Sequence, residues 1–197
     1  MNILIAPDAF KDCLSARQVA MALTDGLKAL LPASTFELVP MADGGEGTVE
    51  SIIDATGGKR ITVTVKDPLL REINSFYGIT GDGNTAIIEM AAASGLELLD
   101  ERERDPWVTS SYGTGQLIRD ALDHGCRKIL LGIGGSATND CGAGMAGALG
   151  VKFFKSDGTT CGQGGGELDK VDRISMREII QGFQRPNFWW HVMCQIR

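Results

Sequence analysis

Residues 130–150 read LLGIGGSATNDCGAGMAGALG: an apolar run, paired glycines, a cluster of short polar residues, and then a run of small residues. This pattern predicts a buried strand over residues 129–133, a turn, and a helix that ends near Gly150. A glycine-rich turn before a helix directs backbone N–H groups at one point, where a phosphate or carboxylate can bind. The residues of the turn suited to this use are Gly134, Gly135, Ser136, Thr138, Asn139 and Asp140. The alternative is a turn whose serine and aspartate only cap the helix.

Composition narrows the class of protein. The net charge is −6 and no stretch concentrates Lys and Arg, so we expect no nucleic-acid partner. No apolar run approaches the ~20 residues of a membrane span, and Pro7 and Asp8 interrupt the first apolar run too early for a signal peptide. The five cysteines are scattered and there are only two histidines, which favours a reducing cytoplasm and argues against zinc.

The order of elements predicts an α/β protein with two parts. Before Gly58 the chain alternates strand, helix, strand, helix, with Ser15 and Gln18 as a capping box, which indicates a parallel unit. After it, Ile61, Val63 and Val65 alternate and residues 81–84 (GDGN) signal a hairpin, which indicates antiparallel strands. We therefore expect a Rossmann- or flavodoxin-like parallel α/β domain, incomplete here, at residues 1–58 and a second, mixed α/β domain at 59–175. We also expect a helix over residues 116–124 and no regular element beyond about residue 175.

Four turns carry the candidate chemistry: Asp8 with Lys11, residues 43–47, residues 109–115, and residues 134–140. They supply a lysine, carboxylates, hydroxyls and amides, which is the set that phosphoryl transfer needs for phosphate oxygens, Mg²⁺ and the attacking hydroxyl. The pattern of a P-loop is absent. We assign catalytic roles to Asp8, Lys11 and Asp43 and metal binding to Asp43 and Asp140. The substrate- or phosphate-binding candidates besides the 134–140 turn are Gly44, Gly45, Glu46, Gly47, Ser110, Gly113 and Thr114.

A dinucleotide-binding module is a weaker alternative. Gly132, Gly134 and Ala137 fit a loose G-x-G-x-x-A pattern. That reading requires an acidic residue about twenty positions further on, where Asp157 is the candidate.

Taken together, the turns resemble the bacterial-type glycerate kinase family. The matching stretches are residues 5–16, 39–48, 89–96, 109–115 and 132–145. The resemblance implies phosphorylation of D-glycerate to 2- or 3-phosphoglycerate, with ATP and Mg²⁺ as cofactors and two α/β domains around a cleft. A catalytically silent fragment that keeps only weak affinity for glycerate or nucleotide is the other reading. Self-association into a homo-oligomer is compatible with the unfinished parallel unit.

The resemblance extends over about the first 170 residues, and members of the family are roughly twice as long as this chain. We interpret residues 176–197 as an aberrant tail, read out of frame. Residues 188–193 (FWWHVM) must be encoded TTY-TGG-TGG-CAY-GTN-ATG. In a shifted frame these bases can spell Leu-Val-Ala-Cys-Asp, followed by Val if the next bases are TG, and the family has V-A-C-D-V at about this point.

This interpretation predicts that the encoding DNA continues a family-like sequence in the shifted frame. Sequencing that DNA is the test, and a shifted frame without such a continuation would refute the interpretation.

Overall fold

The computed structural model describes residues 1–197 except 9, 11–12, 42–43, 46, 181–188 and 194–197. Its strands, α-helices and 3-10 helices (η) are, in chain order, β1 (Asn2–Ile5), α1 (Ala16–Leu30), β2 (Thr35–Leu38), α2 (Thr48–Thr56), β3 (Lys59–Lys66), β4 (Glu72–Ile79), β5 (Thr85–Glu89), α3 (Ala91–Ser94), η1 (Leu96–Leu98), η2 (Glu101–Glu103), α4 (Tyr112–Asp123), β6 (Lys128–Gly132), α5 (Ala143–Ala148), β7 (Lys152–Phe154), η3 (Gly165–Lys170), β8 (Arg173–Ser175) and β9 (Trp189–Met193).

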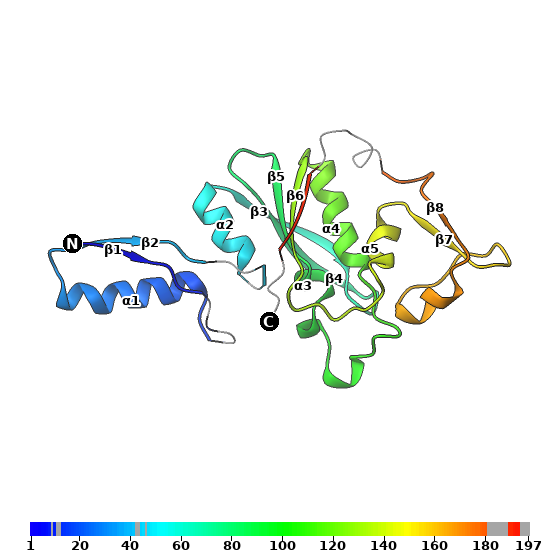
Figure 1. Ribbon diagram of the computed structural model, residues 1–197, viewed down its shortest axis with the longest axis horizontal. Helices are drawn as coiled ribbons and strands as arrows, with labels where there is room; N and C mark the ends of the chain where they lie inside the picture. Colours follow the sequence, from blue (N-terminus) through cyan, green and yellow to red (C-terminus); the bar gives the residue numbers. More distant parts are fainter. Residues whose placement is uncertain (9, 11–12, 42–43, 46, 181–188, 194–197) are drawn as a thin grey trace.

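The strands of the described residues form three sheets. β1 and β2 are parallel, β7 and β8 are antiparallel, and the largest sheet has the order β3-β4-β5-β6-β9. Within this sheet β3, β4 and β5 are antiparallel, whereas β5, β6 and β9 are parallel. The predicted fold class is confirmed: a parallel α/β unit precedes a mixed α/β domain (Figure 1).

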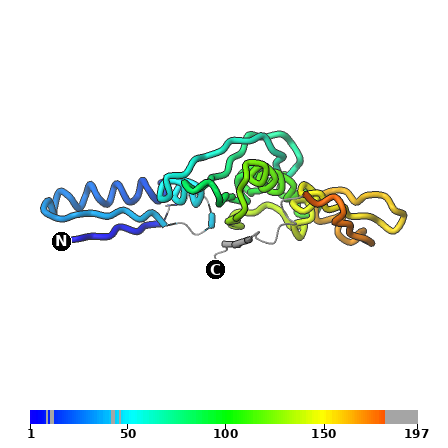
Figure 2. Tube along the Cα trace, turned by 90° about the horizontal axis from the view of Figure 1, so that it is seen from above, coloured from blue at the N-terminus to red at the C-terminus, as the bar shows by residue number. Residues whose placement is uncertain are grey.

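The parallel unit extends from one end of the molecule. Figure 2 shows α1 lying along β1 and β2, away from the larger sheet. Ser15 and Gln18 form the predicted capping box, and α1 buries Ala16, Val19 and Ala20. The helix therefore begins where its sequence signal places it and uses one apolar stripe to cover the two strands.

The five-stranded sheet is covered on both faces. Three consecutive residues of β5, Ala86, Ile87 and Ile88, are fully buried, and successive strand residues point to opposite faces. Ala86 and Ile88 belong to the core cluster that includes Leu117, Ile118 and Ala121 of α4. On the other face, α2 lies so close to β4 that a Cβ at Gly78 would be 2.6 Å from Ile53 Cγ2.

The position of α2 bears on the division into domains. The predicted boundary at residue 58 places α2 with the parallel unit. In the structure α2 packs on the larger sheet, and the Val49 amide donates to Glu89 Oε1 of β5 at 2.8 Å. The boundary at residue 58 remains a prediction, and this packing favours a boundary before α2.

Helix α4 begins four residues earlier than predicted. It spans Tyr112–Asp123, so Gly113, Thr114 and Gly115 lie within its first turn and not in a loop. Glycine is a poor helix former, by about 1 kcal/mol relative to alanine. Here the glycines allow close packing: a Cβ at Gly113 would be 1.8 Å from Lys66 O, and one at Gly115 would be 2.3 Å from Met145 O. Tertiary packing thus overrides the local helix propensity.

The expectation of no regular element after residue 175 is wrong. Trp189–Met193 form β9, which pairs in parallel with β6 from Lys128↔Trp189 to Gly132↔Met193 (red in Figure 1). Tryptophan and valine favour strands, and the backbone of β6 supplies the matching donors and acceptors. Pattern analysis could not find this strand, because its pairing partner is distant in the sequence.

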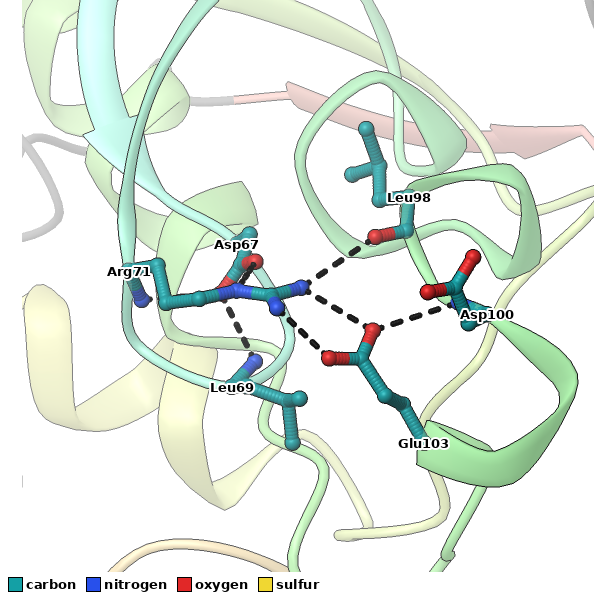
Figure 3. Close-up of polar contacts among 6 residues, drawn as sticks. All are labelled: Asp67, Leu69, Arg71, Leu98, Asp100 and Glu103. Atoms are coloured by element: carbon teal, nitrogen blue, oxygen red, sulfur yellow. Dashed lines mark hydrogen bonds and ion pairs between the residues drawn. The ribbon is translucent and has the colours of Figure 1, made fainter.

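A buried aspartate organises the turn between β3 and β4 (Figure 3). Asp67 is 1% exposed and its Oδ1 accepts the amides of Leu69 and Arg71, each at 2.8 Å. Arg71 Nε donates to Asp67 Oδ2 at 2.5 Å, and its Nη1 donates to Glu103 Oε1 at 2.7 Å. The guanidinium therefore joins this turn to η2 through Glu103 and to η1 through Leu98, whose carbonyl oxygen accepts from Arg71 Nη2 at 3.3 Å.

We expect Glu103 to make the stability of this region depend on pH. Hydrogen bonds from Arg71 and from the Asp100 amide hold the pKa of Glu103 below its usual range. A carboxyl whose pKa is lower in the folded state contributes stability above its unfolded pKa of about 4.3, and this contribution is lost as pH falls through the folded pKa. Glu103→Gln should therefore lower the Tm slightly at pH 7 and flatten the fall of Tm below about pH 4.3.

Glu101→Gln, in the same 3-10 helix, is the matched control and should behave as the wild type. Thermal unfolding followed by circular dichroism across pH measures both variants. Identical pH profiles for Glu103→Gln and the wild type would contradict the expected role of the ion pair.

Candidate functional site

Two glycine-rich backbone segments touch directly at the carboxyl end of β6. A Cβ on Gly132 would lie 2.2 Å from Gly44 O, and one on Gly134 would lie 3.2 Å from Gly45 Cα. Gly132 ends β6 and is opposite Glu89, the last residue of β5. The turns at residues 43–47 and 134–140, predicted separately, are thus brought together at the edge where parallel sheets bind ligands.

The turn after β6 is braced by the segment that follows β5. The Met90 amide donates to Gly132 O at 2.8 Å, the Leu96 amide to Gly135 O at 3.0 Å, and the Ala137 amide to Ser94 O at 2.8 Å. These bonds fix residues 132–137 from one side. Gly135 has a φ of +69°, a left-handed conformation that glycine adopts at little cost.

Five of the predicted binding residues of this turn are accessible. Gly134, Ser136 and Thr138 are half-buried, whereas Gly135 and Asn139 are exposed. Ser136 Oγ accepts the Thr138 amide at 3.2 Å and lies 3.1 Å from Thr138 Oγ1. The two hydroxyls therefore form a local cluster beside the glycines.

Asp140 is used inside the protein. It is 2% exposed, and its carboxylate accepts hydrogen bonds from the Ser111 amide and hydroxyl and from the amides of Gly142 and Gly144, at 2.8–3.1 Å. A buried carboxylate with this set of donors stabilises the junction between α4 and α5. Its geometry does not support the predicted role as a metal ligand.

The hydroxyl-rich segment 109–115 is likewise buried. Ser110 is fully buried, and its Oγ donates to Gln163 Oε1 at 2.8 Å and accepts the Tyr112 amide at 3.2 Å. Thr114, also fully buried, lies 2.8 Å from Ser94 through their hydroxyls. Gly113 packs on Lys66. The structure therefore assigns Ser110, Gly113 and Thr114 to the support of the site and does not place them at its surface.

The acidic turn is described in part. Gly44, which is buried, donates its amide to Thr48 Oγ1 at 3.1 Å, and Gly47, with a φ of +84°, is the N-cap of α2. Asp8 is exposed just after β1, where the Met41 amide donates to Pro7 O at 2.9 Å. This bond brings the first turn beside the second, as expected for two parallel strands. The predicted residues Lys11, Asp43 and Glu46 lie outside the described residues.

Glu89 had no predicted role, although it begins the matching stretch 89–96. Its side chain is at the end of β5, 4% exposed, and among its contacts is the Val49 amide of α2. A single carboxylate that ends an otherwise apolar buried strand was the available signal. Buried carboxylates are rare unless they are paired.

In the described part of the chain, neither a cluster of metal-binding side chains nor a cavity coincides with the predicted site. Its His, Cys, Asp and Glu side chains include no group of three or more that could hold a metal ion. Two cavities, of about 140 and 320 Å³, lie beside α5 and contain none of the predicted site residues; both are lined by Ala143, Phe153, Leu168 and Val171. Across the described ranges we find no helix with the length and apolar character of a membrane span.

The contact between Gly132 and Gly44 predicts that Gly132→Ala destabilises the protein. The new methyl group would overlap a carbonyl oxygen, and overpacking of this kind costs about 1–3 kcal/mol. Gly26→Ala is the control, because its Cβ would have no atom within 4 Å and its position inside α1 should gain about 0.5–1 kcal/mol. Urea unfolding measures both changes, and an unchanged midpoint for Gly132→Ala would contradict the close contact.

The comparisons with known proteins agree on one family. Residues 3–197 match the glycerate kinase family. The chain is 52% identical over 195 residues to a glycerate kinase of Halalkalibacterium halodurans, covering 99% of this chain and 51% of that protein. It is 52% identical over 176 residues to glycerate 2-kinase of Escherichia coli, covering 89% of this chain and 46% of that protein.

A solved structure is similar over the whole chain. The crystal structure of a protein assigned as glycerate kinase 2 from Salmonella typhimurium LT2 superimposes with a TM-score of 0.89 at 45% identity, over 100% of this chain and 52% of that one. The chain thus spans about half the length of these relatives. The family match reaches residue 197, whereas the match to the Escherichia coli protein covers 176 residues, and the frame-shift interpretation of residues 176–197 remains a prediction. Through this match over nearly its whole length, the chain belongs to the glycerate kinase family.

Proposed function

We propose that the protein transfers a phosphoryl group from ATP to a hydroxyl of D-glycerate and forms 2- or 3-phosphoglycerate. The observation that carries this proposal is the direct contact between the Gly44–Gly45 and Gly132–Gly134 backbones at the carboxyl end of β6. The relatives named glycerate kinase and glycerate 2-kinase support the choice of substrate.

In this proposal the turn after β6 binds an anionic group. The accessible groups are the backbone at Gly134 and Gly135, the hydroxyls of Ser136 and Thr138, and the Asn139 side chain. These groups fit either a phosphate of ATP or the carboxylate of glycerate, since both present several oxygen acceptors to N–H and O–H donors.

The two neighbouring turns would supply the charged groups. Asp43 takes the proton of the attacking hydroxyl, and Lys11 offsets charge on the transferred phosphoryl group. Asp8 is the second candidate carboxylate. These three roles rest on the sequence, because Lys11 and Asp43 lie outside the described residues.

Mg²⁺, the second proposed cofactor, does not fit at Asp140, whose oxygens already accept four donors. We assign a bound Mg²⁺ to Asp43 of the acidic turn instead, with Asp8 of the first turn as the second candidate carboxylate. When bound, the ion would neutralise charge on the phosphate oxygens.

A binding protein without turnover is the second candidate. It is favoured by the observation that the chain spans about half the length of its relatives. In that case the turn after β6 binds its anion and no phosphoryl group is transferred.

Two assays separate the candidates. ATP consumption is measured with D-glycerate by a coupled assay, with the Escherichia coli glycerate 2-kinase as positive control. Titration calorimetry measures D-glycerate and ATP with Mg²⁺ separately. Turnover supports the kinase, binding without turnover supports the second candidate, and the absence of both would refute the proposed site.

Ser136→Ala tests the turn itself. Loss of a neutral hydrogen bond to the ligand should weaken binding by about 0.5–1.5 kcal/mol, and by more if the acceptor is charged. Thr80→Ala is the matched control, because its hydroxyl also accepts a turn amide, from Thr85 at 3.3 Å, but lies in the β4–β5 hairpin. Affinity per folded molecule should fall only for Ser136→Ala. Equal affinities with a lowered Tm would mean that Ser136 only builds the turn.

A further inference from the structure

We propose that Glu89 is a positioning residue that holds the Gly44–Thr48 turn against the end of β6. This inference rests on the proposed function for its purpose, because the turn it holds directly follows Asp43 in the sequence and carries the binding candidates Gly44, Gly45 and Gly47. Its structural part rests on the geometry around α2 alone.

Glu89 faces α2 from the end of β5. It lies two residues after Ile87, and side chains two apart in a strand point to the same face. On that face a Cβ at Gly78 would contact Ile53, Val49 and Ile87, so this is the face that α2 covers. Glu89 Oε1 accepts the Val49 amide at 2.8 Å, and both residues are buried.

The N-terminus of α2 needs this acceptor. Its N-cap, Gly47, has no side chain to accept from the amides of the first turn, so these amides must bond elsewhere. A carboxylate in this place is also favoured by the positive end of the helix dipole. Glu50, the acidic residue in the first turn, pairs at the surface with Arg60 at 3.2 Å.

Fixing the start of α2 fixes the turn before it. Thr48 precedes Val49 and accepts the Gly44 amide at 3.1 Å, which closes the turn onto the helix. Gly44 in turn contacts Gly132. Glu89 and Gly132 are paired residues of adjacent strands, so the same sheet edge holds the turn from two points.

The test compares Glu89→Ala with Glu89→Gln. The alanine variant should shift the Val49 amide proton upfield and speed hydrogen exchange at Val49, Thr48 and Gly44 roughly ten- to a hundredfold, the range for loss of a hydrogen bond to a charged group. Glutamine keeps an oxygen acceptor of the same reach and should restore part of the exchange protection. D-glycerate and ADP affinities per folded molecule should fall roughly tenfold in the alanine variant.

Glu72→Gln is the control, because it removes one negative charge from the exposed end of β4, where Glu72 pairs with Lys66 at 3.3 Å. It should leave the Val49 amide and both affinities unchanged. The proposal is overturned if the Val49 shift and exchange in Glu89→Ala match the wild type, or if affinity is unchanged in both Glu89 variants. The exchange measurement needs no ligand. A wild type that binds neither D-glycerate nor ADP would refute the proposed function. Exchange at the Val49, Thr48 and Gly44 amides would still test the role of Glu89.

Discussion

The candidate site depends on two stretches of backbone that touch with no side chain between them. Gly132 ends the strand β6, and Gly44 packs on it so closely that a Cβ there would lie 2.2 Å from Gly44 O. Gly134 follows the strand, and a Cβ there would lie 3.2 Å from Gly45 Cα. Backbone contact of this kind brings amide groups from two separate loops into one place, which side chains would otherwise hold apart. The hydrogen bonds from Met90, Leu96 and Ala137 then hold one of these loops in place.

Most of the fold could be predicted from local patterns. The capping box of α1 and the alternation of β3 are signals carried by residues close in sequence, and they gave correct elements. The start of α4 and the strand β9 were missed because their causes are distant. Gly113 is helical because of what it packs against, and β9 exists because β6 lies beside it.

The candidate site was harder to predict than the fold. A serine, threonine or aspartate in a glycine-rich turn has the same sequence signature whether it faces a ligand or the interior. Ser136 and Asp140 lie in one turn, yet the first is accessible and the second is enclosed by four donors. Glu89 was missed for the opposite reason. Its role depends on Val49, forty residues earlier, and no spacing rule connects the two.

The pairing of β9 with β6 shows what the edge of this sheet selects. A parallel ladder is made from main-chain N–H and C=O groups, so it responds to length and extended conformation and hardly to side-chain identity. Within the described ranges β9 is the last strand of the sheet, and its far side repeats the row of groups that β6 offered to it. Each added strand presents the same kind of unpaired edge as the strand it pairs with. A segment of quite different composition could therefore pair in the same place.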